Sequence, residues 1–273
     1  MKHNRRTLTL ALLVLAVLFL LLVLIGGALS AEAAMKTDFS RKNLAPCLQY
    51  PFGTDWMGRD MFARTLAGLS MSMRIGLLTA TVSAVFALAL GAGAALGGKA
   101  ADSLVNWLID LVMGIPHILL LILIAFACGK GFWGVVIGIT FTHWMSLARL
   151  LRGEILQLRQ SGYVQVAAKL GASRAKIAVR HMLPHLLPQF TVGLILLFPH
   201  AILHEASITF LGFGLPPEQP AIGVILSESM RYLITGNWWL AVFPGALLVL
   251  IVVLFDYAGS SLRQLFDPTS AHE

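Results

Sequence analysis

The chain has 273 residues, of which 58% are hydrophobic and only 12% are charged, whereas soluble domains carry about 25% charged residues. With a mean hydropathy of +0.81, this composition indicates an integral membrane protein and excludes a soluble globular domain. The net charge of +7 does not indicate a nucleic-acid partner, because the basic residues stand at the ends of apolar segments, where membrane proteins keep them.

Six apolar runs follow one another along the chain, and most reach the roughly 20 residues that a helix needs to cross a bilayer. They cover residues 8–29, 75–97, 104–127, 132–147, 189–213 and 238–259. The fourth run is short and rich in glycine, so its ends are the least certain. Because lipid excludes open strands, the sequence predicts an all-α integral membrane bundle of about six transmembrane helices.

The first run can be interpreted either as a transmembrane helix or as a cleavable signal peptide. It follows a basic N-terminus and ends near Ala28-Leu29-Ser30, a triplet that resembles a cleavage site. The apolar region of a signal peptide has about 7–15 residues, and this run is longer. We therefore interpret residues 1–30 as a basic cytosolic N-terminus that includes Lys2, followed by a retained transmembrane helix.

Lys and Arg set the expected orientation, because short cytosolic loops carry an excess of them. With the N-terminus inside, twelve Lys and Arg fall on the cytosolic side and eight on the external side, and six of those eight lie in the long segment 30–74, which counts for less. The cytosolic side includes segment 150–188. The basic residues of this segment are Arg152, Arg159, Lys169, Arg174, Lys176 and Arg180. With this segment and both termini in the cytosol, segments 31–74 and 214–237 are external. Cys47 and Cys128 would then both face outward, which leaves open whether they form a single bridge.

Small and helix-breaking residues occur at telling intervals inside 150–188. Ala167 and Ala168 let a helix lie close to another surface, and Gly171 permits a positive φ that ends this helix. Ser173 can cap the next helix, which Pro184 is expected to end. The pattern predicts two short helices joined by a turn, suited to a groove on a partner protein; the alternative is a plain amphipathic helix on the membrane surface.

These residues resemble the signature of the permease subunits of ABC importers, in which Glu-Ala-Ala, Gly and Leu-Pro build a coupling helix that sits in a cleft of the ATPase subunit. The match departs at Gln165, which stands for the usual Glu, and at Val166, which stands for the first Ala. The resemblance implies ATPase coupling by Gln165, Val166, Ala167, Ala168, Gly171, Ala172, Ser173, Arg174, Leu183 and Pro184.

Two further elements narrow the resemblance to the dipeptide, oligopeptide and nickel permeases. Residues 51–60, PFGTDWMGRD, resemble an element typical of the second of their two permease subunits, and residues 205–214, EASITFLGFG, resemble another. The motif residues of the first element are Gly53, Thr54, Asp55, Gly58, Arg59 and Asp60. Asp267-Pro268 near the C-terminus also fits, whereas Ser260 stands where Asp is usual.

The resemblance implies a type I ABC-importer permease fold, with a core over 75–268 that contains the loop 150–188, and a tail over 269–273. Such a chain forms half of a translocation path in the bacterial inner membrane and is not an enzyme. It binds no cofactor, because ATP and magnesium belong to partner subunits. The implied partners are a second permease subunit, two ATPase subunits, an extracytoplasmic substrate-binding protein and the lipid bilayer.

A near-match to a phosphate-binding loop at residues 93–100 does not change this expectation. It ends in Ala100, so it lacks the hydroxyl that holds magnesium in such loops. Gly93 and Gly97 are better interpreted as a face of small residues for close helix packing.

Ionisable residues inside the apolar runs are candidates for the translocation path, because such groups are costly in lipid and often functional. His200 and His204 are four residues apart and project from one helix face; Glu205 and His143 are further candidates. Imidazole suits nickel and related transition metals. Nickel-type permeases resemble this chain in a His-x3-His before the FLG element and in a His-Trp like His143-Trp144.

We therefore expect nickel or a related transition metal, free or chelated, as cargo, with His200 and His204 as metal ligands. Import of dipeptides or oligopeptides is the alternative, and purely structural histidines are the plainer interpretation. A membrane enzyme and a self-powered secondary carrier are disfavoured, because the sequence contains neither a HExxH pattern nor a convincing internal repeat.

Overall fold

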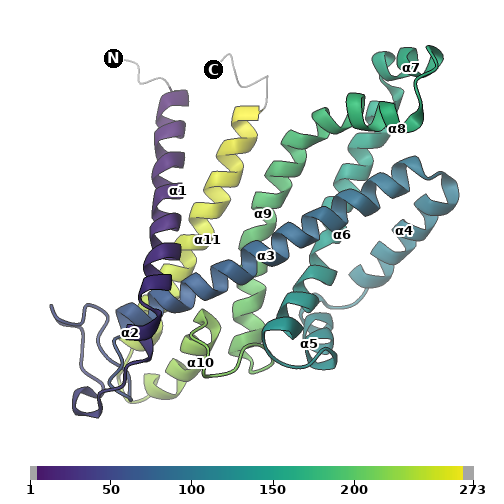
Figure 1. Ribbon diagram of the computed structural model, residues 1–273. Helices are drawn as coiled ribbons and strands as arrows, with labels where there is room; N and C mark the ends of the chain where they lie inside the picture. The colour runs from purple at the N-terminus through teal and green to yellow at the C-terminus, as the bar shows by residue number, and fades with distance from the viewer. Residues whose placement is uncertain (1–4, 267–273) are drawn as a thin grey trace.

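The computed structural model describes residues 5–266 as a bundle of helices (Figure 1). Lys2, Asp267-Pro268 and the expected tail 269–273 lie outside these described residues. The elements are α1 Arg5–Leu29, α2 Ala31–Met35, η1 Phe39–Arg41, α3 Met61–Leu96, α4 Lys99–Met113, α5 His117–Ala127, α6 Phe132–Gln160, α7 Gly162–Lys169, α8 Arg174–Ile177, η2 Ala178–Met182, α9 Leu183–Phe210, α10 Ile222–Leu233 and α11 Trp239–Phe266.

Five helical stretches of the described chain are long and apolar enough to span a membrane, and a bent helix pair makes a sixth. The prediction of an all-α bundle with about six spans is therefore confirmed. The third run, expected as one straight span, is instead broken into α4 and α5, which meet at an angle of 96°. The break falls at Gly114-Ile115-Pro116, because a residue before proline is disfavoured in the α region.

Two helices extend well beyond the apolar runs that predict them. The helix α3 begins at Met61, so the last part of the segment expected to be external, 31–74, is helical. The helix α6 continues from Phe132 to Gln160, well past the end of its apolar run. Polar side chains at these helix ends lower the local hydropathy, and they remain helical because they find partners within the fold.

The long helix α3 is the centre of the bundle and packs against α1, α6 and α9. Leu69, Met73 and Phe198 are fully buried in the main core. At the crossing with α6, a Cβ on Gly91 would lie 2.7 Å from the carbonyl oxygen of Ala148, so this contact requires glycine. The prediction that Gly93 lies in a close helix contact is wrong within the described chain, since nothing lies within 4 Å of a Cβ built there.

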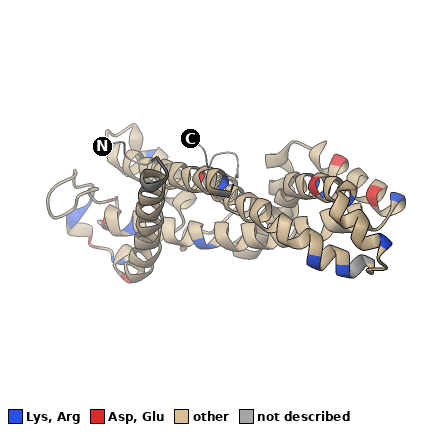
Figure 2. Ribbon diagram, turned by 90° about the horizontal axis from the view of Figure 1, so that it is seen from above, with Lys and Arg blue, Asp and Glu red and all other residues tan. Residues whose placement is uncertain are grey.

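The ends of the helices sort into two groups at opposite ends of the molecule (Figure 1). The start of α1, the end of α11 and the pair α7–α8 lie at one end, whereas α2, α5 and α10 lie at the other. Basic residues gather around α7 and α8 (Figure 2). The start of α1 and the end of α11 therefore lie at the same end of the described chain as segment 150–188, and the side of the membrane that this end faces stays a prediction.

Candidate functional site

The segment expected to couple to an ATPase forms two short helices joined by a tight turn. The helix α7 ends in a Schellman arrangement: the amide of Ala172 donates to the carbonyl of Ala167 at 3.1 Å, and that of Gly171 donates to the carbonyl of Ala168 at 3.1 Å. Gly171 has a φ of +83°, the left-handed conformation that this motif needs. The hydroxyl of Ser173 accepts from the amide of Lys176 at 3.3 Å, so the predicted turn and cap are both present.

The inner side of this segment has its own small apolar core. Val164 of α7 and Ile177 of α8 are buried with Met182 and Leu186, against Ile155 of α6. Burying such side chains contributes about 1.5–3 kcal/mol each. The two short helices are therefore fixed on the bundle as a folded unit.

The outer side of α7 is exposed and partly apolar. Gln165 and Ala168 are exposed, and Ala167 is half-buried. Val166 is 56% exposed, and Leu170, at the end of α7, is 82% exposed. An apolar tip on a fixed, otherwise basic projection is typical of a surface that is covered by another protein.

Pro184 does not end the second helix, contrary to the prediction. Leu183 and Pro184 form the first turn of α9, and the helical path from Arg174 runs through a π-helical turn at Ala178–Met182. Proline cannot donate to the carbonyl four residues earlier and its ring would clash there. The wider π turn accommodates this ring and lets the chain continue into the membrane-spanning helix.

The helix α6 carries α7 directly, and its end is tied to its neighbours. Ser161 is both the last cap of α6 and the first cap of α7. The guanidinium of Arg152 binds both oxygens of Asp102 on α4, a bidentate pair that fixes orientation. Arg159 donates to the carbonyl of Ala95 at 2.6 Å, satisfying a carbonyl at the end of α3. The part of α6 next to α7 is therefore tied directly to α3 and α4.

The motif of residues 53–60 forms a buried lock at the other end of the bundle. The carboxylate of Asp55 accepts from the amides of Met57 and Arg59, at 2.8 and 3.0 Å, and from Nε of Arg59 at 2.6 Å. Asp60 caps α3 by accepting from the amide of Phe62 at 2.9 Å. The hydroxyl of Thr54 donates to the backbone carbonyl of Arg41. These residues therefore hold the segment that precedes α3, which was expected to be external, on the start of that helix.

Three residues of this lock, Arg64, Trp56 and Glu228, were not among the site candidates of the sequence analysis. Arg64 of α3 is 1% exposed and donates to Asp55 at 3.0 Å and to Glu228 of α10. Trp56 lies against the guanidinium groups of Arg59 and Arg64 and stacks on Tyr232 at a ring distance of 4.6 Å. Glu228 is 164 positions away from Arg64 in the sequence, so no local pattern pairs them.

We expect Gly58→Val to release the segment before α3, which is predicted to be external, from its packing on that helix. Gly58 has a φ of +73°, and a Cβ there would lie 1.7 Å from the carbonyl oxygen of Asp38. Conformational strain and this clash together should destabilise the segment by at least about 2 kcal/mol. Proteolysis in right-side-out vesicles measures the loss. Gly129→Val is the control, because Gly129 has a φ of +85° and open space around it; equal nicking of both variants would contradict the lock.

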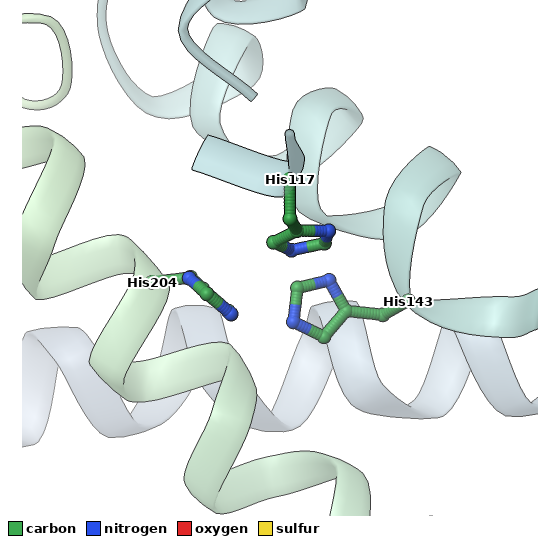
Figure 3. A group of neighbouring side chains, drawn as sticks. All are labelled: His117, His143 and His204. Carbon is green, nitrogen blue, oxygen red and sulfur yellow. The ribbon is translucent and has the colours of Figure 1, made fainter. Parts of the chain in front are cut away.

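Two of the predicted histidines lie together with a histidine that was not a site candidate, around an open cavity that residues of α5, α6 and α9 line. His143 and His204 lie beside His117, the first residue of α5 (Figure 3). His200 lines the same cavity of about 630 Å³ but is not in the close cluster. His117 lies outside the motifs that the sequence analysis used, and only the break before α5 brings its side chain here.

Glu205 does not line this cavity. It is fully buried and accepts from the hydroxyl of Thr209 at 3.0 Å. The nearby Ser72 hydroxyl of α3 accepts from the amide of Ile222 at the start of α10 at 3.2 Å. Glu205 therefore belongs to the packing between α9, α3 and α10. Cys47 and Cys128 are both exposed and free.

These features define a multi-span membrane subunit that presents a folded helical projection to a partner, and comparisons with known proteins agree. Residues 86–271 match the family described as the binding-protein-dependent transport system inner membrane component. The dipeptide transport system permease protein DppC of Bacillus subtilis is 30% identical over 98% of this chain and 83% of its own length. A Brucella suis protein named as a peptide transport system permease is 37% identical over 82% of this chain and 75% of its own length.

The fold has solved counterparts as well. A chain of the inward-facing MetNI methionine ABC transporter aligns with a TM-score of 0.62 and 18% identity, covering 75% of this chain and 97% of that one. The chain belongs to the family of binding-protein-dependent transport system inner membrane components, and it is a permease subunit of an ABC importer. ATP hydrolysis in such importers resides in separate subunits.

Proposed function

We propose that this chain couples ATP hydrolysis to import through α7 and the turn that follows it. The observation that carries the proposal is the exposed tip formed by Val166 and Leu170 on a projection whose inner side is buried. In this scheme the end of the bundle with α7 and α8 faces the cytosol, together with both chain ends. Two ATPase subunits, a second permease subunit and an external binding protein complete the importer.

The external end then receives cargo from the binding protein. The lock around Asp55 and Arg64 keeps segment 36–60 in a fixed shape beside α10, which supports a role for this end as the docking surface. Closure of the ATPase subunits on ATP would move α7 and, through α6, the cavity-lining helices, so that the path opens alternately to the two sides.

We propose a dipeptide or another short peptide as the cargo. The support comes from the relatives, whose names refer to dipeptide and peptide transport. The nickel expectation finds no counterpart among the relatives reported above. The size of the cavity, about 630 Å³, suits a small organic solute.

The cargo is tested by uptake in a strain whose other peptide importers have been removed. Deleting this chain should abolish uptake of a labelled dipeptide and leave uptake of radioactive Ni²⁺ unchanged, and expression of the chain from a plasmid should restore the peptide uptake. Normal dipeptide uptake with a loss of Ni²⁺ uptake would overturn the peptide proposal and favour metal as cargo.

A further inference from the structure

Three imidazoles from three different helices converge inside the bundle. His117 begins α5, His143 lies in the middle of α6, and His204 lies in the second half of α9. One ring nitrogen from each lies within 4.8 Å of those of the other two. The ring centroids of His117 and His204 are 4.4 Å apart, and His143 is 5.0 and 5.1 Å from these two. Figure 3 shows the three rings turned toward a common space.

Hydrogen bonding leaves ring nitrogens free to bind a ligand in this space. Nδ1 of His143 lies 2.9 Å from the carbonyl oxygen of Ile139. Because a carbonyl can only accept, Nδ1 carries the proton and Nε2 keeps its lone pair. Nε2 of His143 and Nε2 of His117 are both buried without a hydrogen-bond partner in the described structure. Buried polar atoms without a partner are rare, and each one calls for an explanation.

We propose that His117, His143 and His204 bind a divalent transition metal ion such as Ni²⁺, Co²⁺, Zn²⁺ or Cu²⁺. Imidazole nitrogen suits these ions, whereas Mg²⁺ and Ca²⁺ take oxygen ligands. A histidine that donates a hydrogen bond from its other ring N–H to a backbone carbonyl, as His143 does, is the usual form of a metal ligand. The absence of a carboxylate from the cluster fits an ion that is held by neutral nitrogen donors.

The distances allow binding after a small closure. Metal–nitrogen bonds of about 2.0–2.1 Å in a tetrahedral site put the nitrogens about 3.4 Å apart. Rotation of the side chains over about 1 Å brings the observed cluster to that size, and the adjoining cavity leaves room for this movement. A fourth coordination position would face the cavity, where His200, water or a donor group of the cargo can occupy it.

A bound ion would join α5, which follows the break after α4, to the helix that carries α7. His117 directly follows the break at Gly114–Pro116, whereas His143 belongs to α6, which runs on into α7. The ion would therefore hold α5 against α6 and α9 and stabilise one arrangement of the bent pair. This proposal does not depend on which cargo is imported.

The test is a metal titration of the full chain, purified with an affinity tag that contains no histidine and stripped with a chelator. One Co²⁺ per chain should bind and give the visible absorption of a tetrahedral nitrogen site, and Zn²⁺ and Ni²⁺ should displace it. His117→Asn, His143→Gln and His204→Gln should each weaken binding by at least about tenfold. His181→Gln with His185→Gln, near the other end of α9, is the matched control and should leave it unchanged.

The proposal would be overturned if the wild-type chain does not bind Co²⁺. It would also be overturned if Co²⁺ binding persists when all three histidines are replaced. A larger loss with His200→Gln than with any of the three would overturn this ligand set. Modification of the wild-type chain by diethyl pyrocarbonate avoids any dependence on variant folding. Zn²⁺ should protect His117, His143 and His204 but not His181 or His185, and equal modification with and without Zn²⁺ would also contradict the site. The titration involves no transport, so its failure leaves peptide import untouched.

Discussion

Leu170→Asp is expected to abolish import while the chain still inserts and folds. Leu170 is 82% exposed at the tip of α7, so the substitution removes little internal packing. In the assembled importer an aspartate there would be buried against the ATPase without a partner, at a cost of about 3–5 kcal/mol. The affinity for the ATPase subunit should fall by at least about a hundredfold, measured by co-purification and by cargo-stimulated ATP hydrolysis.

Leu48→Asp is the matched control for this experiment. Leu48 is a fully exposed leucine in the external segment, at the opposite end of the molecule, and receives the same substitution. It should leave both the ATPase association and the coupled hydrolysis at wild-type levels. Equal behaviour of the two variants would show that a new charge on the surface, and not the tip of α7, is responsible for the loss.

Arg64→Ala should destabilise the end of the bundle that holds the lock around Asp55. It removes one guanidinium that serves two carboxylates, Asp55, which is fully buried, and Glu228, which is 22% exposed. Arg59 stays beside both carboxylates, at 2.6 Å from Asp55 and 3.6 Å from Glu228, so the cost is that of the lost hydrogen bonds to charged groups, about 1.5–3 kcal/mol each. The variant should show a lower midpoint of thermal unfolding in detergent and faster proteolysis of segment 36–60.

The comparison for Arg64 is Arg149→Ala. Arg149 pairs with Asp110 at 2.9 Å, but the two side chains are 49% and 71% exposed, so the pair should contribute at most about 1 kcal/mol. If Arg64→Ala lowers the unfolding midpoint no more than Arg149→Ala does, the network around Asp55 does not hold the external segment in place.

Local patterns predict the coupling segment because its structure depends on neighbours in the chain. Gly171 and Ser173 act through backbone groups within a few residues, so the helix–turn–helix can be derived from their spacing alone. Pro184 is different: a π turn just before it removes the clash that would otherwise end the helix, and no local sequence pattern predicts that turn.

The histidine cluster and the external lock depend on contacts that spacing does not encode. The i, i+4 rule pairs His200 with His204 because they share a helix face, whereas the fold brings His204 to His117 and His143 through the break before α5. In the same way, the sequence around Arg64 predicts neither that this residue lies in α3 nor that it pairs with Glu228. The motif residues indicate where the two sites lie. The contacts within each site depend on the packing of helices that are distant in the sequence.

Cross-linking at the tip of α7 tests the coupling role most directly. Leu170→Cys is introduced after Cys47 and Cys128 have been replaced by serine, and membranes that contain the whole importer are treated with a short thiol cross-linker. Leu170→Cys should join this chain to the ATPase subunit through a cysteine placed in that subunit's cleft, and the same reaction at Leu48→Cys should give no product. A cysteine at position 170 that reacts instead with a membrane-impermeant maleimide added outside intact cells would contradict the account.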